Sequence, residues 1–283
     1  MKMIKLEVIS QFPPGLTHMI GFTESDPTNA QTLTSAQISD FNRDGFLAPL
    51  AALSEEETLE SRRYFDQLLS TMESMDDGRN AYAIMGYQNR CKGIWDLAMH
   101  PKILDYVEDL LGPDFVCWTT HYFCKVPGDE RRVPWHQDAT YWPVRPTDTV
   151  TAWLAIDDVA ADMGPMRFIP GSHRLGKVDW RRAEGDVALQ QEIPDAERFG
   201  EPVDDVLRAG EISLHTSTLV HGSEPNTSDR RRCGLTLRYI PSSATVKEGA
   251  EGWDFITLLI SSSLINGISA GIRNISLIPF SKR

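Results

Sequence analysis

Residues 211–240 read EISLHTSTLVHGSEPNTSDRRRCGLTLRYI, and this stretch decides the fold class. It contains two runs rich in residues that favour strands, 211–222 and 233–240, separated by a turn-rich polar segment. Working outward, residues 116–126 (VCWTTHYFCKV), 149–159 (TVTAWLAIDDV) and 166–172 (MRFIPGS) have the same character. The sequence from about Phe115 onward therefore predicts short strands in antiparallel sheets.

The first third of the chain has helical signals instead. Residues 34–37 (TSAQ) and 54–57 (SEEE) match the capping box that begins a helix, and Pro101 and Gly112 bracket a third helical pattern. The second of these helices has an apolar stripe of expected core residues: Leu59, Phe65, Leu68, Leu69 and Met72. Helices followed by many strands, without βαβ alternation, predict a mainly β jelly-roll or cupin-like barrel supported by N-terminal helices.

Composition narrows the class of protein. Apolar residues make up 41% of the 283 positions and charged residues 24%, which is typical of a soluble globular protein. The formal net charge of -12 disfavours binding to nucleic acid or to anionic membranes. The four cysteines show no CxxC spacing and the N-terminus resembles no secretory signal, so we expect a cytoplasmic protein.

We divide the chain into three regions. Residues 1–33 are rich in Pro, Thr, Ser and Asn and are expected to form an irregular lead-in, residues 34–245 a single domain, and residues 246–283 an atypical tail. Within the tail, residues 255–272 carry no charge, but serines, an asparagine and glycines dilute their hydrophobicity. This composition favours a strand or helix packed on the domain over a membrane helix.

The segment PWHQDATYW, residues 134–142, contains the chemistry-bearing motif His136-x-Asp138. On a strand, these two side chains would point to the same face because side chains alternate. His221 follows another β-rich run and opens a turn-rich segment that can return it to that face. Two histidines and one carboxylate form the facial set that binds Fe(II) in oxygenases and leaves positions open for other ligands.

Arg232 lies eleven residues after His221, at the start of a β-rich run. An arginine inside a barrel requires an anion, and its planar guanidinium can bind a carboxylate with two hydrogen bonds. A dicarboxylate that chelates iron at one end would present its other carboxylate there. These features indicate 2-oxoglutarate as co-substrate.

The chain resembles the phytanoyl-CoA dioxygenase family of Fe(II)- and 2-oxoglutarate-dependent oxygenases. The resemblance is carried in order by residues 33–37 with Phe41, 44–46, 135–138, 141–142, 153–158, 164–165, 169–173, 221–223 with Asn226 and Ser228, Arg232 and Tyr239. It implies a double-stranded β-helix. It also implies that His136, Asp138 and His221 are the catalytic iron ligands and that Arg232 anchors the distal carboxylate of 2-oxoglutarate.

The resemblance suggests further residues of the site. Thr119 and His121 lie in the run where relatives contribute to the co-substrate and substrate pocket. Trp153 matches a position near the co-substrate, although a tryptophan inside a β-rich run is more often a core residue. Tyr141 and Trp142 are candidates for a substrate wall. His215 is expected to be an ordinary hydrogen-bonded core histidine.

The implied reaction is hydroxylation of a small molecule with O2, releasing succinate and CO2. Asp138 favours this over halogenation, because halogenating relatives lack the metal carboxylate. Two alternatives stay open: a cupin-like metalloenzyme that does not use 2-oxoglutarate, and a catalytically silent barrel with a binding role. The substrate and the oligomeric state are not indicated.

Overall fold

The computed structural model describes residues 7–9, 20–75, 84–247 and 258–261. Its α-helices are α1 Ser35–Asp44, α2 Glu55–Ser74, α3 Lys92–Ala98, α4 Pro101–Leu111 and α5 Asp138–Tyr141. Its strands are β1 Glu7–Ile9, β2 Phe46–Ala51, β3 Asp114–Lys125, β4 Val133–His136, β5 Val144–Arg145, β6 Val150–Ala155, β7 Met166–Phe168, β8 Arg181–Arg182, β9 Gln191–Glu192, β10 Val203–Asp204, β11 Glu211–Thr216, β12 His221–Ser223, β13 Arg232–Pro241, β14 Thr245–Lys247 and β15 Leu258–Ser261.

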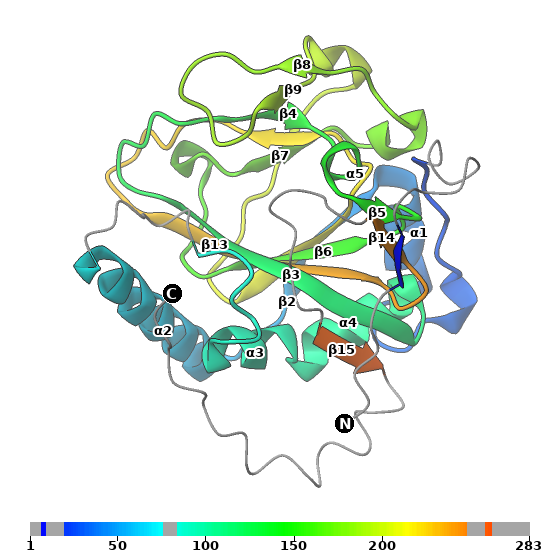
Figure 1. The fold of residues 1–283 in the computed structure, drawn as a ribbon, viewed down its shortest axis with the longest axis horizontal. Helices are drawn as coiled ribbons and strands as arrows, with labels where there is room; N and C mark the ends of the chain where they lie inside the picture. The colour runs from blue at the N-terminus through cyan, green and yellow to red at the C-terminus, as the bar shows by residue number, and fades with distance from the viewer. Residues whose placement is uncertain (1–6, 10–19, 76–83, 248–257, 262–283) are drawn as a thin grey trace, which may run out of the picture.

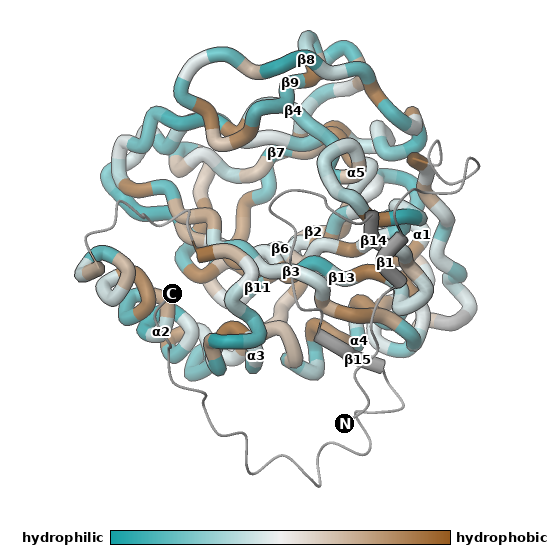
Figure 2. The backbone as a smooth tube through the Cα atoms, viewed as in Figure 1, coloured by the Kyte–Doolittle hydropathy of each residue, from teal (hydrophilic) through white to brown (hydrophobic). Residues whose placement is uncertain are grey.

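The predicted helix starts are confirmed. The side chains of Thr34 and Ser54 each accept a hydrogen bond from the third amide of their helix, and Gln37 and Glu57 complete both capping boxes. Pro101 opens α4. The stripe predicted along α2 is wrong at its first member, because the side chain of Leu59 is 46% exposed. Figure 2 shows hydrophobic and hydrophilic residues alternating along α2, as expected of a helix with one face toward the core.

Two antiparallel sheets make up the body of the fold. One has six strands in the order β15-β3-β13-β6-β11-β2, and the other has four in the order β10-β7-β12-β4. Residues of both sheets line one cavity, so the sheets face each other across it. Figure 1 shows the four-stranded sheet above and the six-stranded sheet below it. This arrangement confirms the predicted double-stranded β-helix.

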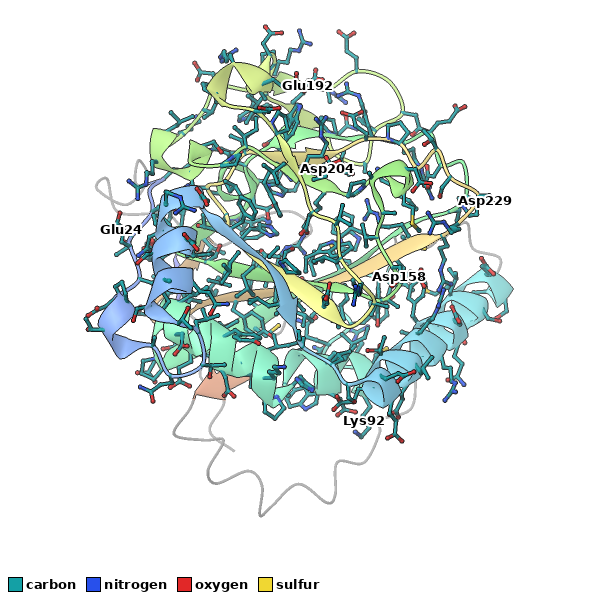
Figure 3. All side chains as sticks on the ribbon, turned by 180° about the vertical axis from the view of Figure 1, so that it is seen from behind. Glu24, Lys92, Asp158, Glu192, Asp204 and Asp229 are labelled. Carbon is teal, nitrogen blue, oxygen red and sulfur yellow. The ribbon has the colours of Figure 1, made fainter. Side chains whose placement is uncertain are left out.

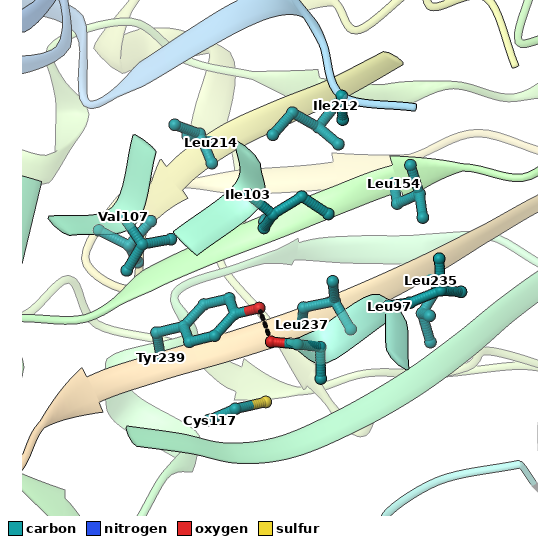
Figure 4. Close-up of a cluster of buried hydrophobic side chains, with 14 of the residues drawn as sticks. Leu97, Ile103, Val107, Cys117, Leu154, Ile212, Leu214, Leu235, Leu237 and Tyr239 are labelled. Carbon is teal, nitrogen blue, oxygen red and sulfur yellow. Dashed lines mark hydrogen bonds between the residues drawn. The ribbon is translucent and has the colours of Figure 1, made fainter. Parts of the chain in front are cut away.

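Helices α2, α3 and α4 cover the outer face of the six-stranded sheet (Figure 1). Ile103 and Val107 of α4 pack against a cluster that includes Leu235 and Leu237 of β13 (Figure 4). The hydroxyl of Tyr239 in the same strand donates a hydrogen bond of 2.9 Å to the carbonyl oxygen of Ala98. The apolar core therefore joins this sheet to the helices, and the opposite face of the sheet is left to the cavity.

Side-chain alternation along β13 separates these two environments. Cys233, Leu235 and Leu237 belong to the helix-covered core. Arg232, Thr236 and Arg238 line the cavity. Packing thus fixes the orientation of the strand, and that orientation places its polar residues between the sheets.

The described parts of the lead-in and tail pack on the domain. In the lead-in, β1 pairs in parallel with β14, and the hydroxyl of Ser25 donates to the carbonyl oxygen of Leu110. In the tail, β15 pairs with β3, as expected for a packed strand, and residues 262–272 lie outside the described residues. The division at residue 246 stays a prediction. None of the helices in the described ranges is long and apolar enough to span a membrane.

Charged side chains lie mainly on the outside of the molecule. Figure 3 shows Glu24, Lys92 and Asp229 at its periphery, seen from behind, and all three residues are exposed. The charges that are buried are consequently informative about the site.

Candidate metal centre

His136 and His221 face each other across two neighbouring strands. His136 is the last residue of β4, His221 is the first of β12, and the two are direct partners in the antiparallel ladder. Their ring centroids are 4.1 Å apart, and both residues are about 95% buried. The ladder thus brings together two imidazoles that are 85 positions apart in the chain.

Asp138 reaches the same place by a different local geometry from the one predicted. The strand ends at His136, and Asp138 is the first residue of the one-turn helix α5. Its carboxylate oxygens lie 3.6 Å from Nε2 of His136 and 4.0 Å from Nε2 of His221. The prediction of a shared face was therefore right about the outcome and wrong about its cause, since the chain turns after the histidine.

Hydrogen bonds prepare both imidazoles as metal ligands. Nδ1 of His136 lies 2.8 Å from the carbonyl oxygen of Pro134, and Nδ1 of His221 lies 3.0 Å from that of Leu219. A carbonyl only accepts, so Nδ1 carries the proton and the lone pair is on Nε2. This is the usual outer support of a metal-binding histidine.

Electrostatics favour the cation-binding forms of His221 and Asp138. Burial, together with neighbouring His136, lowers the pKa of His221 to about 4, so the ring is neutral at pH 7. Burial alone would raise the pKa of Asp138, but the neighbouring His136, His221 and Arg238 outweigh it and hold the pKa well below its ordinary value. Metal binding requires such a neutral imidazole and an ionised carboxylate.

The ligand atoms of His136, Asp138 and His221 all lie within 4.8 Å of one another. They open into a cavity of about 430 Å³ between the two sheets. Eight of the nine predicted site residues line this cavity: His121, His136, Asp138, Tyr141, Trp142, Trp153, His221 and Arg232. Residues from separate parts of the sequence therefore converge on one space.

Thr119 is the exception. It is fully buried on β3, opposite Arg238 of β13, and it does not contribute to the cavity lining among the described residues. Its strand parity matches that of His121, and the register shift of the ladder lies beyond the pair, between Arg238 and Tyr239. Of this directly opposed pair, only Arg238 lines the cavity.

Arg232 is 98% buried and projects over the indole of Trp153, with its Cζ 5.5 Å from the ring centroid. One of its amino groups donates to the carbonyl oxygen of Gly164. Its neighbour Arg231 points the other way, where it pairs with Asp157 and Asp66. Arg231 and Arg232 therefore point to opposite sides of the chain.

Trp153 and the predicted substrate wall have mixed environments. Trp153 lines the cavity and also packs with Ala155 in a buried cluster, so both roles considered for it are compatible with its position. Trp142 is buried edge-on against Trp118 at 5.4 Å, whereas Tyr141 is 43% exposed at the cavity. The wall is thus rigid on one side and open to solvent on the other.

The cavity lining that was not predicted includes three titratable residues close to the site, Lys125, His215 and Arg238. The ring of His215 lies 5.0 Å from that of His221, and burial holds its pKa well below the ordinary value, so it is neutral. The guanidinium of Arg238 lies 5.2 Å from the ring centroid of Trp142. The alternation of side chains along a strand could have identified two of them. Arg238 lies an even number of residues from Arg232, and Lys125 an even number from His121, so each pair shares a face of its strand.

The donor set fits a ferrous ion. Two imidazole nitrogens and one carboxylate on one side of an ion leave the remaining coordination positions toward the cavity, as in mononuclear iron oxygenases. The buried cations Arg232 and Lys125 elsewhere in the cavity suit an anionic co-substrate. The site thus combines a metal position with an anion position.

Comparison with known proteins agrees with this geometry. Residues 41–234 match the family described as phytanoyl-CoA dioxygenase (PhyH). Human peroxisomal phytanoyl-CoA dioxygenase is 30% identical over 146 residues, which cover 49% of this chain and 43% of that protein, so the chain spans less than half of that relative's length. L-proline trans-4-hydroxylase of Streptomyces griseoviridis is 26% identical over 225 residues, covering 70% of this chain and 83% of the hydroxylase.

Solved structures support the same assignment. The non-heme monooxygenase ThoJ superposes with a TM-score of 0.67 and 28% identity, covering 79% of this chain and 82% of that one. The alpha-ketoglutarate-dependent carbocyclase SnoK of nogalamycin biosynthesis superposes with a TM-score of 0.65 and 25% identity, covering 80% and 91%. Because the family match extends over more than half of the sequence, the chain belongs to the phytanoyl-CoA dioxygenase family of iron- and 2-oxoglutarate-dependent oxygenases.

Proposed function

We propose that this protein is an Fe(II)- and 2-oxoglutarate-dependent dioxygenase that hydroxylates a small molecule and releases succinate and CO2. The observation that carries the proposal is the convergence of His136, Asp138 and His221 on the same cavity as the buried Arg232. The first three residues would hold the metal, and Arg232 would bind the distal carboxylate of 2-oxoglutarate. With both bound, the site supplies oxidation of a carbon–hydrogen bond by O2, driven by decarboxylation of the co-substrate.

The protein's own part is to position the reactants and limit access of water. The two sheets enclose the cavity, and the buried rings of Trp142 and Trp153 form part of its wall. Tyr141, at the exposed end of α5, lies where a substrate would enter. Holding a substrate carbon close to the metal in a shielded pocket lowers the entropic barrier of the reaction.

Hydroxylation is the finer part of the proposal. It is supported by the presence of Asp138 and by similarity to a proline hydroxylase. Solved neighbours also include a carbocyclase and an epimerase from nogalamycin biosynthesis, so one scaffold accommodates several outcomes. Each of these outcomes consumes 2-oxoglutarate, and the product formed from the substrate distinguishes them.

The test is an anaerobic calorimetric titration with Fe(II) and then 2-oxoglutarate, followed by addition of O2 and a panel of small molecules. We expect binding of both ligands, and succinate formation that rises with the true substrate, whose mass increases by one oxygen atom. His136→Ala should abolish iron binding. His100→Ala is the matched control, because His100 caps α4 near Glu57 and is absent from the cavity lining of the described chain.

The outcomes separate the alternatives. Iron binding without 2-oxoglutarate binding would favour a cupin-like metalloenzyme that does not use this co-substrate. Failure to bind iron in the wild-type protein would favour a catalytically silent barrel. Either result would refute the proposed function.

A further inference from the structure

Lys125 and Arg232 are direct partners in the antiparallel ladder between β3 and β13. Both side chains line the cavity, and the two residues are 1% and 2% exposed, respectively. Directly opposed residues of an antiparallel pair have Cβ atoms roughly 5 Å apart. The fold therefore buries two cations side by side on one wall of the cavity.

Each of these two cations donates a hydrogen bond to a backbone carbonyl oxygen. Lys125 donates through Nζ to the carbonyl oxygen of Glu224, and Arg232 donates to that of Gly164. Gly164 packs so tightly against the carbonyls of residues 224 and 225 that a Cβ there would overlap them. The backbone at residue 164 and at residues 224–225, which are in contact, thus positions both cations.

Within the described ranges, no carboxylate lies within 4 Å of Nζ of Lys125. A buried ammonium without a directly paired carboxylate is costly, and a like charge beside it adds to the cost. An anion entering from the cavity would offset both effects. The arrangement is therefore that of an anion site with two cations.

We propose that Lys125 is the second cation of the site for the distal carboxylate of 2-oxoglutarate, and that it determines the preference for a dicarboxylate over a monocarboxylic 2-oxo acid. This inference rests on the proposed function. Arg232 supplies the planar fork, and Lys125 supplies a point charge to the same carboxylate group. The metal-binding end of the co-substrate is common to both classes of acid, so selection takes place at this pair.

A pH dependence follows from the surroundings of Lys125. Burial and the neighbouring Arg232 lower its pKa to about 7; Asp129 and Glu224 oppose this shift, while Arg131 adds to it. A bound carboxylate would raise the pKa again. Affinity for 2-oxoglutarate should therefore be greatest below pH 7 and decrease as the pH rises above it, because binding then requires uptake of a proton.

The experiment compares two ligands on Fe(II)-loaded protein by anaerobic calorimetry: 2-oxoglutarate and 2-oxopentanoate, which lacks the distal carboxylate. Lys125→Met should weaken binding of 2-oxoglutarate roughly 10-fold or more, as expected for a charge-assisted hydrogen bond. It should leave the dissociation constant of 2-oxopentanoate unchanged. Lys92→Met removes an exposed lysine on α3 and should change neither constant.

A second measurement needs no substitution. For the wild-type protein, the dissociation constant of 2-oxoglutarate relative to that of 2-oxopentanoate should rise several-fold between pH 6 and pH 8.5. In Lys125→Met this ratio should be independent of pH. The ratio cancels any effect of pH on the metal ligands, because both ligands chelate iron through the same groups.

The inference would be overturned if Lys125→Met weakened the binding of both ligands equally, or the binding of neither. The proposed function would remain intact in both cases. A wild-type ratio that does not change with pH would also overturn it. Absence of any 2-oxoglutarate binding by the wild-type protein would overturn both proposals, and the calorimetric titration shows which case applies.

Discussion

Gly234 of β13 lies directly against the indole of Trp153 on the neighbouring strand β6, so closely that a Cβ at position 234 would overlap the ring. The same indole lies beneath the guanidinium of Arg232. The missing side chain of the glycine thus determines where the tryptophan lies, and the tryptophan in turn supports the arginine.

Gly234→Ala should displace Trp153 and weaken both the fold and the anion site. We expect a loss of roughly 1–3 kcal/mol in the free energy of unfolding, as for other overpacked positions, together with weaker 2-oxoglutarate binding. Chemical denaturation and calorimetry measure the two effects. Gly21→Ala is the control, since a Cβ at position 21 meets nothing within 4 Å; equal losses in both variants would contradict the role given to Gly234.

Arg232→Met should raise the dissociation constant of 2-oxoglutarate about 30-fold or more, because truncating one partner of a buried charge pair costs about 2 kcal/mol or more. Iron binding should persist, since Arg232 is not among the grouped ligands. Arg230→Met provides the control two positions away, where the side chain is 53% exposed and pairs with Asp162. An unchanged co-substrate affinity in Arg232→Met would exclude the arginine as the anchor.

Asp205→Asn should change the pH dependence of stability. Burial raises the pKa of Asp205 to about 7 from an ordinary value of 3.8, although the hydroxyl of Ser213 donates to it and Arg232 lies nearby. A carboxyl group whose pKa is higher in the folded chain than in the unfolded chain stabilises the folded state when it is protonated. This contribution is complete below about pH 4 and is lost as the pH rises from 4 to 7. Each tenfold difference in proton affinity is worth about 1.4 kcal/mol.

We therefore expect the melting temperature of Asp205→Asn to decrease less between pH 4 and pH 8 than that of the wild-type protein. At pH 8 the variant should have the higher melting temperature of the two. The amide oxygen can still accept from Ser213. Asp179→Asn, at an exposed carboxylate, should follow the wild-type curve. A variant that is less stable than the wild type at pH 8 would show that the folded chain requires the ionised carboxylate.

Leu237→Ala should destabilise the core between β13 and the helices by about 2–5 kcal/mol, because it leaves a cavity in a fully buried cluster. Denaturant titration gives the value. The matched variant Leu59→Ala removes a leucine that is 46% exposed and should cost far less. Comparable losses in the two variants would mean that the helix layer contributes little to the stability of the sheet.

The sequence predicted features with local causes better than features that depend on strand pairing. Helix starts follow from capping residues within four positions, so those of α1 and α2 were predicted correctly. The β-rich run that begins at Arg232 was enough to predict that this arginine lies inside the barrel, and Arg232 does line the cavity. The family motif then led to three residues whose ligand atoms lie within 4.8 Å of one another and could hold a metal ion.

Other features required the three-dimensional ladder. The pairing of Lys125 with Arg232 joins strands more than 100 residues apart, and no local pattern specifies it. Thr119 has the parity of His121 but does not line the cavity, because alternation gives the face of a strand and not how far along the strand the cavity extends. Leu59 had the correct helical spacing, but burial depends on where the sheet ends beneath the helix.

Strand β13 serves the helix-packed core with one set of residues and the cavity with the alternate set, and this limits how the protein can change during evolution. Deleting or inserting one residue would turn its leucines toward the reactants and its arginines into hydrocarbon. New substrate preferences must therefore arise by replacement in place along this strand, or in a loop such as residues 186–189 at the cavity, where length can vary without inverting any neighbour.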